Sequence, residues 1–196
     1  MTLPKVYLYN FSCDDHSLTD LEYLLGEQRF EYCAKMKSVK AGLCSAYAFL
    51  LLRYALKQEF GITDIPRFTY NEHGKPFLCG AEGIYFNMSH AAERVVCAVS
   101  RSPVGADIQD IRKMNLRTAE KFLTAGEFSA VSGITDENKL NAELCRLWCI
   151  KESYGKFTGK GFGEGFTGFE ADSLAAAGKI RWVRRDNYFI SVCGES

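Results

Sequence analysis

The sequence predicts an α+β fold, because strand signals and long helix signals recur in a similar order along the chain. Residues 41–60 are rich in Leu, Ala, Tyr and Phe, and residues 140–157 repeat apolar side chains at steps of three and four, so both segments predict helices. Short runs rich in Val, Ile, Tyr and Phe between turn residues predict strands. The order occurs twice and splits near residue 102, which permits two similar halves without requiring them.

The composition is that of an ordinary globular protein. The 196 residues suffice for one large domain or two small ones. The 24 Lys and Arg residues balance 24 Asp and Glu residues, so no overall field attracts nucleic acid or a membrane surface. No apolar run approaches the roughly 20 residues that span a bilayer, and the N-terminal residues do not resemble a signal peptide. We therefore expect a cytoplasmic protein with no nucleic-acid and no membrane partner.

The eight cysteines are scattered, and no C-x-x-C pattern occurs. Zinc-ribbon and thioredoxin-like sites are thereby excluded. We expect most of these cysteines to be small buried hydrophobic residues in a reducing compartment.

The first half predicts strands over residues 6–11, 67–70, 84–90 and 95–99, and a helix over 41–60 that ends at Gly61. An earlier helical region carries a basic cluster, which is either a solvated helix face or a rim for an anion. Its members are Arg29, Lys35, Lys37 and Lys40. Ser89 and His90 fall where a strand is expected to end, a common place for site residues.

The second half predicts a strand over residues 104–111, on which Asp107 and Gln109 share one face. A carboxylate between apolar neighbours on a strand is costly to bury unless it is paired or binds a metal. Helices are expected over 115–122 and 126–131, a loop over 134–140, and a terminal hairpin around residues 186–187. Thr124 and Glu127 have the spacing of a capping box, which is the structural alternative for Glu127.

Glu152 and Lys156 are four residues apart on the later helix and therefore lie on one face, with Trp148 one turn earlier. The simplest interpretation is a surface ion pair worth a few tenths of a kcal/mol. Considered together with Asp107, Gln109, Lys75 and His90, the pair instead indicates a site for Mg²⁺ and phosphate, since Mg²⁺ binds few protein carboxylates and leaves positions for phosphate and water. Lys and His side chains would bind the phosphates.

Five motifs, in order and in register over residues 20–165, resemble the 4′-phosphopantetheinyl transferases of the larger, surfactin-synthetase-activating type. They are Gly74-Lys75-Pro76, Phe86-Asn87-x-Ser89-His90, Val104-Gly105-x-Asp107-x-Gln109, Phe122-x-x-x-x-Glu127 and Trp148-x-x-Lys151-Glu152-Ser153-x-x-Lys156-x-x-Gly159-x-Gly161. The chain length also suits this monomeric, two-lobed type better than the shorter trimeric synthases.

The resemblance implies transfer of the 4′-phosphopantetheine arm from coenzyme A to a serine of an apo acyl, peptidyl or aryl carrier protein, with Mg²⁺ as cofactor and adenosine 3′,5′-bisphosphate as the second product. It implies two similar lobes related by a pseudo-twofold axis, each an antiparallel sheet packed with a long helix. Residues 1–102 would form the lobe that binds the adenosine and 3′-phosphate side of coenzyme A. Residues 103–196 would carry magnesium and the catalytic residues.

The resemblance also implies individual roles. The expected metal ligands are Asp107, Gln109 and Glu152. The expected catalytic residues are Glu152, Lys156 and Glu127, with Glu127, Glu152 or a metal-bound water as the base. The expected coenzyme A contacts are Lys75, Pro76, Ser89, His90, Lys151 and Lys40.

Two positions depart from the family pattern. Gln109 stands where the family often has a second acid, so it brings an amide oxygen but no charge. Cys44-Ser45 stands near the position where the family usually has an arginine for the 3′-phosphate, and Lys40 is the expected substitute.

Two other functions remain open at this stage. One is a non-catalytic module that binds coenzyme A or a carrier protein. The other is an unrelated Mg²⁺-dependent nucleotidyl or phosphoryl transferase, although the chain has no G-x-x-x-x-G-K-[ST] pattern. Phe122 and Leu123, beside Arg117 and Lys121, either meet an acidic carrier helix or pack inside the protein.

Overall fold

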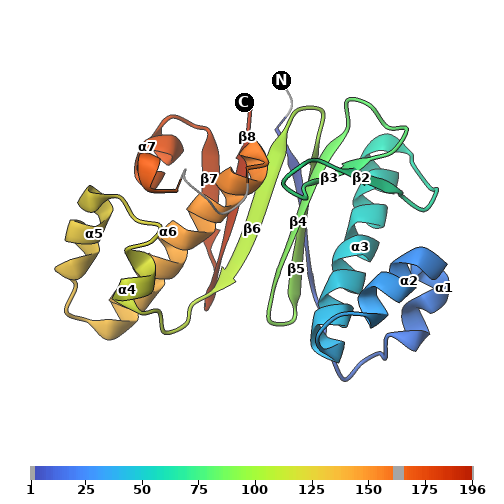
Figure 1. Cartoon of the computed structure of the whole chain (residues 1–196), viewed down its shortest axis with the longest axis horizontal. Helices are drawn as coiled ribbons and strands as arrows, with labels where there is room; N and C mark the ends of the chain where they lie inside the picture. The colour runs from blue at the N-terminus through green and yellow to red at the C-terminus, as the bar shows by residue number, and fades with distance from the viewer. Residues whose placement is uncertain (1–2, 161–165, 196) are drawn as a thin grey trace.

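Two three-stranded antiparallel sheets form the centre of the computed structural model, which describes residues 3–160 and 166–195 (Figure 1). The first sheet has the order β1-β5-β4, with β1 Lys5–Asn10, β5 Arg94–Ser100 and β4 Tyr85–Ala91. The second has the order β6-β8-β7, with β6 Val104–Asp110, β8 Tyr188–Gly194 and β7 Ile180–Arg184. A separate hairpin pairs β2 Phe68–Tyr70 with β3 Pro76–Leu78. The predicted α+β class is confirmed, and the layout is compatible with two lobes.

Each large sheet is covered by one long helix, α3 on the first and α6 on the second (Figure 1). The helices are α1 Glu22–Leu25, α2 Glu27–Ala34, α3 Val39–Phe60, α4 Leu116–Ala119, α5 Ala125–Ser132, α6 Glu137–Thr158 and α7 Ala171–Ala176, with short 3₁₀ turns at Thr19–Leu21 and Phe166–Gly168. Gly161, the last residue of the fifth motif, lies outside the described residues.

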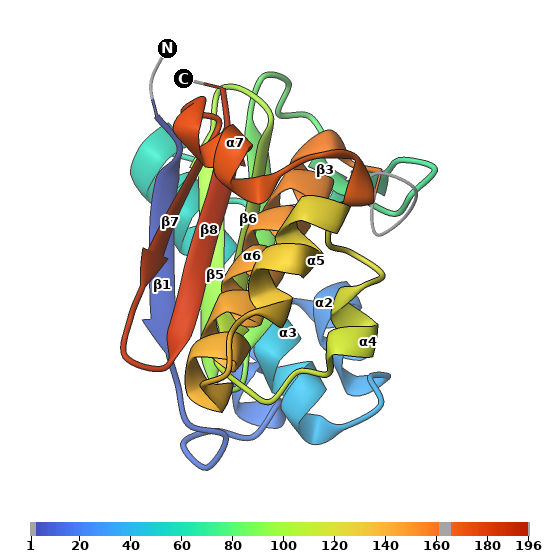
Figure 2. The ribbon, with the colours of Figure 1, turned by 90° about the vertical axis from the view of Figure 1, so that its left-hand side faces the viewer.

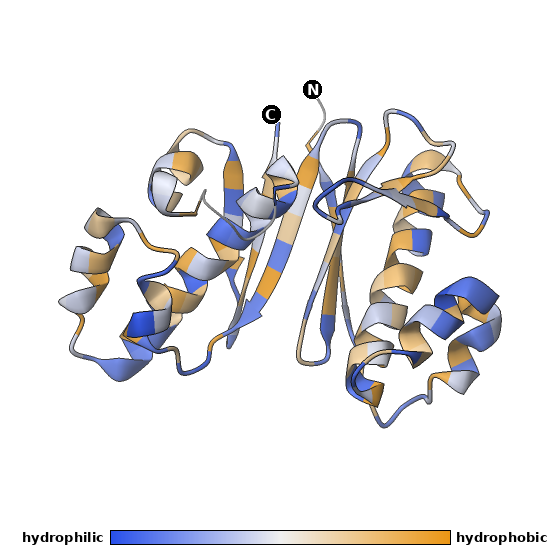
Figure 3. Cartoon of the chain, viewed as in Figure 1, coloured by the Kyte–Doolittle hydropathy of each residue, from blue (hydrophilic) through white to orange (hydrophobic). Residues whose placement is uncertain are grey.

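Helix α3 is the core helix of the N-terminal half. The Ser38 side chain caps its first turn by accepting from the Ala41 amide at 3.2 Å, and Gly61 ends it with φ 69°, as predicted. The helix is long and apolar enough to cross a membrane by length and composition, which the sequence analysis did not anticipate. Because 61% of its most apolar window is buried inside the protein, it serves as a core helix here, and Figure 3 shows its hydrophobic residues.

Helix α6 starts earlier than predicted. The Asp136 side chain accepts from the Lys139 amide at 2.9 Å, so the helix begins at Glu137 and the expected loop over 134–140 is wrong for its last residues. The predicted apolar stripe is confirmed by the burial of Leu144, Leu147 and Ile150. Helix α6 packs directly on β6 at Gly105, which has no side chain. A Cβ there would come within 2.0 Å of the Ser153 carbonyl oxygen. This close approach sets α6 residues beside those of β6.

Phe122 and Leu123 are buried, so they pack inside the protein and form no exposed patch for a carrier helix. The Trp148 ring meets the Phe122 ring edge to face at 4.8 Å. Trp148 therefore belongs to the core of the C-terminal half, whereas the sequence analysis placed it over the charged site.

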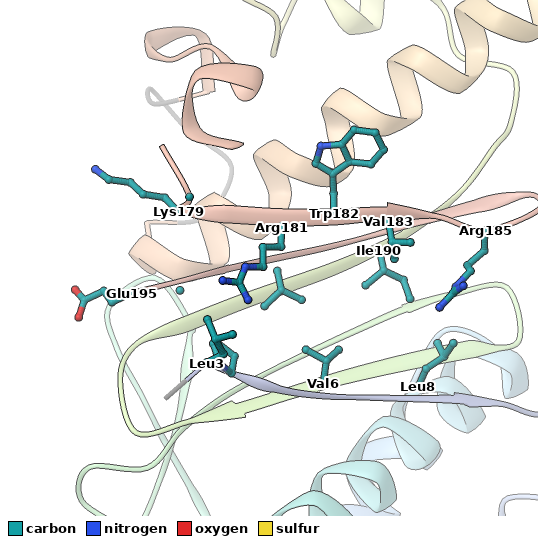
Figure 4. A pocket seen from close by; sticks show the side chains of 14 residues that line it. Leu3, Val6, Leu8, Lys179, Arg181, Trp182, Val183, Arg185, Ile190 and Glu195 are labelled. Carbon is teal, nitrogen blue, oxygen red and sulfur yellow. The ribbon is translucent and has the colours of Figure 1, made fainter. Parts of the chain in front are cut away.

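The two sheets pack against each other through β4, β5 and β6, with Val96, Ala98 and Ile108 buried between them. Away from the helices the sheets diverge, and β1 and β7 line a cavity of about 400 Å³ (Figures 2 and 4). Val6 and Val183 point into this space from opposite walls. The lining includes none of the predicted site residues, so the candidate site lies elsewhere.

Candidate functional site

The candidate site centres on Asp107, which is only 1% exposed. Its Oδ1 accepts hydrogen bonds from Ser89 Oγ at 2.7 Å and from Lys156 Nζ at 2.5 Å. Lys156 Nζ also donates to Ser89 Oγ at 2.9 Å. The structure thus brings together three predicted residues from β4, β6 and α6, and the buried carboxylate has the cationic partner that its burial requires.

Strand β4 carries Ser89 to Asp107 because β4 runs on to Ala91 and packs beside β6. Ser89 and His90 are therefore strand residues paired with Val96 and Val95, and the strand ends at Ala91, one residue beyond the predicted end. Desolvation lowers the pKa of His90, the Lys156 ammonium lowers it further, and the Asp107 carboxylate opposes both. His90 is therefore electrostatically part of the same cluster.

Gln109 follows Asp107 on β6 and shares its face, as predicted. Its Nε2 donates to Asp107 Oδ2 at 3.1 Å. The Gln109 amide therefore orients the Asp107 carboxylate by donating a hydrogen bond to it. An ionised acid at position 109 has no proton to donate and could not do this.

Glu152 lies one turn before Lys156 on α6. Burial raises the pKa of its carboxyl group, and the nearby Asp107 charge raises it further, while Lys156 lowers it. Two carboxylates that repel each other beside a single ammonium form a site where an added cation is favourable.

The chemistry of these donors fits Mg²⁺ only if the ligand completes the coordination. Among the described residues, no group of three or more His, Cys, Asp and Glu side chains is placed to hold a metal ion. Asp107 and Glu152 supply two carboxylates, and Mg²⁺ characteristically takes one or two carboxylates plus phosphate oxygens and water. The residues thus suit a cation that arrives with a phosphorylated ligand.

Glu127 and Lys151 form a separate buried pair. Lys151 Nζ lies 2.8 Å from Glu127 Oε2 and donates to the carbonyls of Phe166 and Phe169. The predicted capping box is confirmed, since Glu127 accepts from the Thr124 amide while Thr124 accepts from the Glu127 amide. The lysine is fully buried and engaged, so these contacts favour a structural role for both residues over the roles that the resemblance implies.

Lys75 and Pro76 lie on the β2–β3 hairpin. Lys75 Nζ donates to main-chain carbonyls of the C-terminal half, and burial lowers its pKa. Pro76 pairs with Tyr70, a residue that lines a cavity of about 800 Å³ between α2 and the hairpin. Lys40, by contrast, forms an exposed ion pair with Glu93 at 3.6 Å.

Arg29 lines that cavity. From the sequence it was predicted only as one member of a basic cluster. Its Nη2 donates to the carbonyl and the hydroxyl of Ser45 at 3.0 and 2.7 Å, so its guanidinium lies at the position on α3 where the expected arginine is missing. Its Nε is buried without a hydrogen-bond partner. Arg67, Tyr32 and Tyr70 line the same cavity, as does one acid, Glu27. No sequence spacing reveals this arrangement, because α2 must first fold against α3.

Comparison with known proteins identifies related chains. Residues 103–194 match the model of the 4′-phosphopantetheinyl transferase superfamily. The chain is 34% identical to 4′-phosphopantetheinyl transferase gsp of Aneurinibacillus migulanus, over 76% of this chain and 62% of that protein. It is 36% identical to psf-1 of Bacillus pumilus (60% and 48%) and 32% identical to Sfp of Bacillus subtilis (57% and 50%), both named 4′-phosphopantetheinyl transferases. The chain thus spans about half to three-fifths of the length of these relatives.

Proposed function

This chain belongs to the 4′-phosphopantetheinyl transferase superfamily, and we propose that it transfers the 4′-phosphopantetheine arm of coenzyme A to a serine of an apo carrier protein. The reaction would release adenosine 3′,5′-bisphosphate. The main support for this proposal is the cluster in which Lys156, Ser89 and Asp107 are hydrogen-bonded beside Glu152. A module that only binds coenzyme A has little need for two carboxylates placed to repel each other.

The cluster supports this reaction through charge. Lys156 would neutralise the diphosphate oxygens as the bond to the leaving group breaks, and Ser89 and His90 would donate hydrogen bonds to the same phosphates. Asp107 and Glu152 would hold Mg²⁺, with Gln109 as the third candidate, and the ion would supply Lewis-acid stabilisation of the diphosphate. Lys156 would exchange Asp107 for phosphate when the substrate binds.

Glu152 is the residue we propose as the base for the carrier serine. Burial raises its pKa in the metal-free protein, and bound Mg²⁺ would lower that pKa again, so Glu152 would meet the serine hydroxyl as the carboxylate that a general base requires. Glu127 is less suited to this role, because both of its carboxylate oxygens accept hydrogen bonds in the capping box and from the Ala171 amide.

The nucleotide end of coenzyme A would occupy the cavity beside Arg29. Its volume of about 800 Å³ suits a nucleotide. We assign the 3′-phosphate to Arg29, with Arg67 as a second cation, since Arg29 has an unpartnered donor while Lys40 is paired with Glu93. Residues 1–102 would thus bind the adenosine side, and residues 103–196 would carry the metal and catalytic groups.

The proposal extends to the setting of the protein. Coenzyme A and an acyl, peptidyl or aryl carrier protein are its partners, and we propose a cytoplasmic monomer without nucleic-acid or membrane partners. The eight cysteines are free thiols, six of them buried, which supports a reducing compartment.

The test is incubation of an apo carrier protein with this chain, coenzyme A and Mg²⁺, followed by intact-protein mass spectrometry. A mass increase equal to one phosphopantetheine arm is expected, and omission of coenzyme A is the control. Binding of coenzyme A without a mass change on any of an acyl, a peptidyl and an aryl carrier protein would favour the non-catalytic module instead.

A further inference from the structure

The ammonium group of Lys75 is bound by the C-terminal half of the protein, although Lys75 lies on the β2–β3 hairpin of the N-terminal half. Its Nζ donates to the carbonyl oxygens of Lys156 at 2.6 Å, Phe157 at 3.0 Å and Val104 at 3.4 Å. Two of these carbonyls belong to the last turn of α6, where carbonyls lack partners within the helix. A cation at this end also interacts favourably with the helix dipole. Lys75 therefore caps α6 from the other half.

The loop that carries Lys75 is itself fixed onto the end of α6. Asn71 Oδ1 accepts from the amides of His73 and Lys75 at 3.0 and 2.7 Å, and Asn71 Nδ2 donates to the Gly159 carbonyl at 3.2 Å. Gly159 has φ 73°, and a Cβ there would come within 3.2 Å of both Asn71 and Lys75. Glycine is thus required both to end α6 and to admit the loop. Figure 1 shows the hairpin reaching toward the end of α6.

Lys156 has a partner from the N-terminal half at each end, Lys75 at its carbonyl oxygen and Ser89 at its ammonium. Lys75 binds its carbonyl oxygen, while its ammonium donates to Ser89 on β4 and to Asp107 on β6. The helix turn that carries Lys156 is thereby fixed relative to the strand that carries Ser89 and His90. A shift of this turn would change the distance between the two sets of phosphate-binding groups.

We propose that Lys75 is a positioning residue, which sets Lys156 against Ser89 and His90 through the main chain of α6. This differs from the coenzyme A contact that the sequence resemblance implies for the Lys75 side chain. The catalytic consequence rests on the proposed function, whereas the fixing of the α6 end does not.

The kinetic test compares Lys75→Met and Lys75→Arg with the exposed-lysine control Lys57→Met. Because small misplacements of reacting groups are costly, Lys75→Met is expected to lower kcat about 10- to 100-fold. Its KM for coenzyme A should stay within about twofold, since a residue that does not touch the substrate does not contribute to its binding. Lys75→Arg, which keeps a cationic donor, should recover part of kcat. A raised KM with unchanged kcat in Lys75→Met would overturn the proposal in favour of direct substrate contact.

Hydrogen exchange gives a readout that does not depend on activity. In Lys75→Met the amides of Phe157, Thr158 and Gly159 should exchange about tenfold faster, while amides of the β8 core stay protected. Asn71→Ala keeps the Lys75 ammonium but removes the contact to Gly159 and the bonds from the His73 and Lys75 amides. It should show the same pattern to a smaller degree and remains informative if Lys75→Met fails to fold. Unchanged exchange at the end of α6 in both variants overturns the positioning role. A wild-type chain that transfers nothing would refute the proposed function and leave this result standing.

Discussion

Asp107 on β6 and Lys156 on α6 form an ion pair of 2.5 Å, and the carboxylate of that pair is almost fully buried. Each charge neutralises the other, and Ser89 and Gln109 also donate hydrogen bonds to the carboxylate. A substrate that brings phosphate to Lys156 and a cation to Asp107 would satisfy both at once. Under the proposed function, the pair would hold these two groups in place until the substrate binds.

Replacement of Asp107 by Ala should abolish transfer, with a loss of at least about 10²–10³-fold, since it removes a charged group directed at the reacting centre. The mass-spectrometric assay with saturating coenzyme A and Mg²⁺ measures this loss. Asp110→Asn on the same strand is the matched control, because Asp110 pairs with Arg94 instead. Wild-type turnover by Asp107→Ala would refute the assigned role.

Replacement of Glu152 by Gln should abolish transfer but stabilise the metal-free protein near neutral pH. The folded-state pKa of Glu152 is raised, so its contribution to stability is fully present below the unfolded pKa and is lost as pH rises through the folded pKa. The neutral amide avoids that loss. Thermal unfolding with a chelator between pH 4 and pH 8 should show a gain that grows with pH. A variant that is less stable than the wild type at neutral pH would contradict this account.

Replacement of Gln109 by Glu should shift the Mg²⁺ dependence of activity to lower concentrations, because a carboxylate adds charge to a hard-cation site. A titration of initial rate against Mg²⁺ concentration measures the shift. Gln109→Ala loses the same hydrogen bond to Asp107 as Gln109→Glu but adds no carboxylate. It should therefore lower activity without shifting the Mg²⁺ dependence to lower concentrations. An unchanged dependence in Gln109→Glu would argue against metal contact.

Replacement of Arg29 by Lys should raise the KM for coenzyme A about tenfold, since Lys cannot reproduce the two-pronged geometry of a guanidinium. The KM for 3′-dephospho-coenzyme A should change little, because that substrate lacks the phosphate. Equal increases for both substrates would show that Arg29 does not bind the 3′-phosphate. Lys40→Met is the comparison variant and should leave both values near those of the wild type.

Removal of one partner of the buried Glu127–Lys151 pair should destabilise the protein by about 3–5 kcal/mol, because an uncompensated charge remains buried. Denaturant unfolding of Lys151→Met, Glu127→Gln and the double variant measures the coupling. The double variant should be less destabilised than the sum of the single changes. Glu127→Gln should keep most of its transfer activity at low temperature, and a loss as large as that of Glu152→Gln would restore Glu127 as the candidate base.

The α+β class, the C-terminal end of α3 at Gly61 and the shared face of Asp107 and Gln109 follow from the sequence alone. These features depend on local rules of capping, periodicity and strand alternation, which act over a few residues. Helix periodicity also places Glu152 and Lys156 one turn apart on one face. Of the two alternatives for Phe122 and Leu123, packing inside the protein is confirmed by their burial.

Which of these groups meet depends on how the helices and sheets pack together. Asp107 and Lys156 are 49 residues apart, and Lys75 reaches the end of α6 across 81 residues, so no local pattern records either contact. Arg29 reaches Ser45 only because α2 packs on α3, and the Lys151 ammonium is buried against the carbonyls of Phe166 and Phe169. Lys156, Lys75 and Lys151 are all lysines in predicted motifs, yet one pairs with Asp107, one caps α6 from the other half and one is buried against Glu127. The sequence does not distinguish them, because burial and partners depend on the packing of the whole chain.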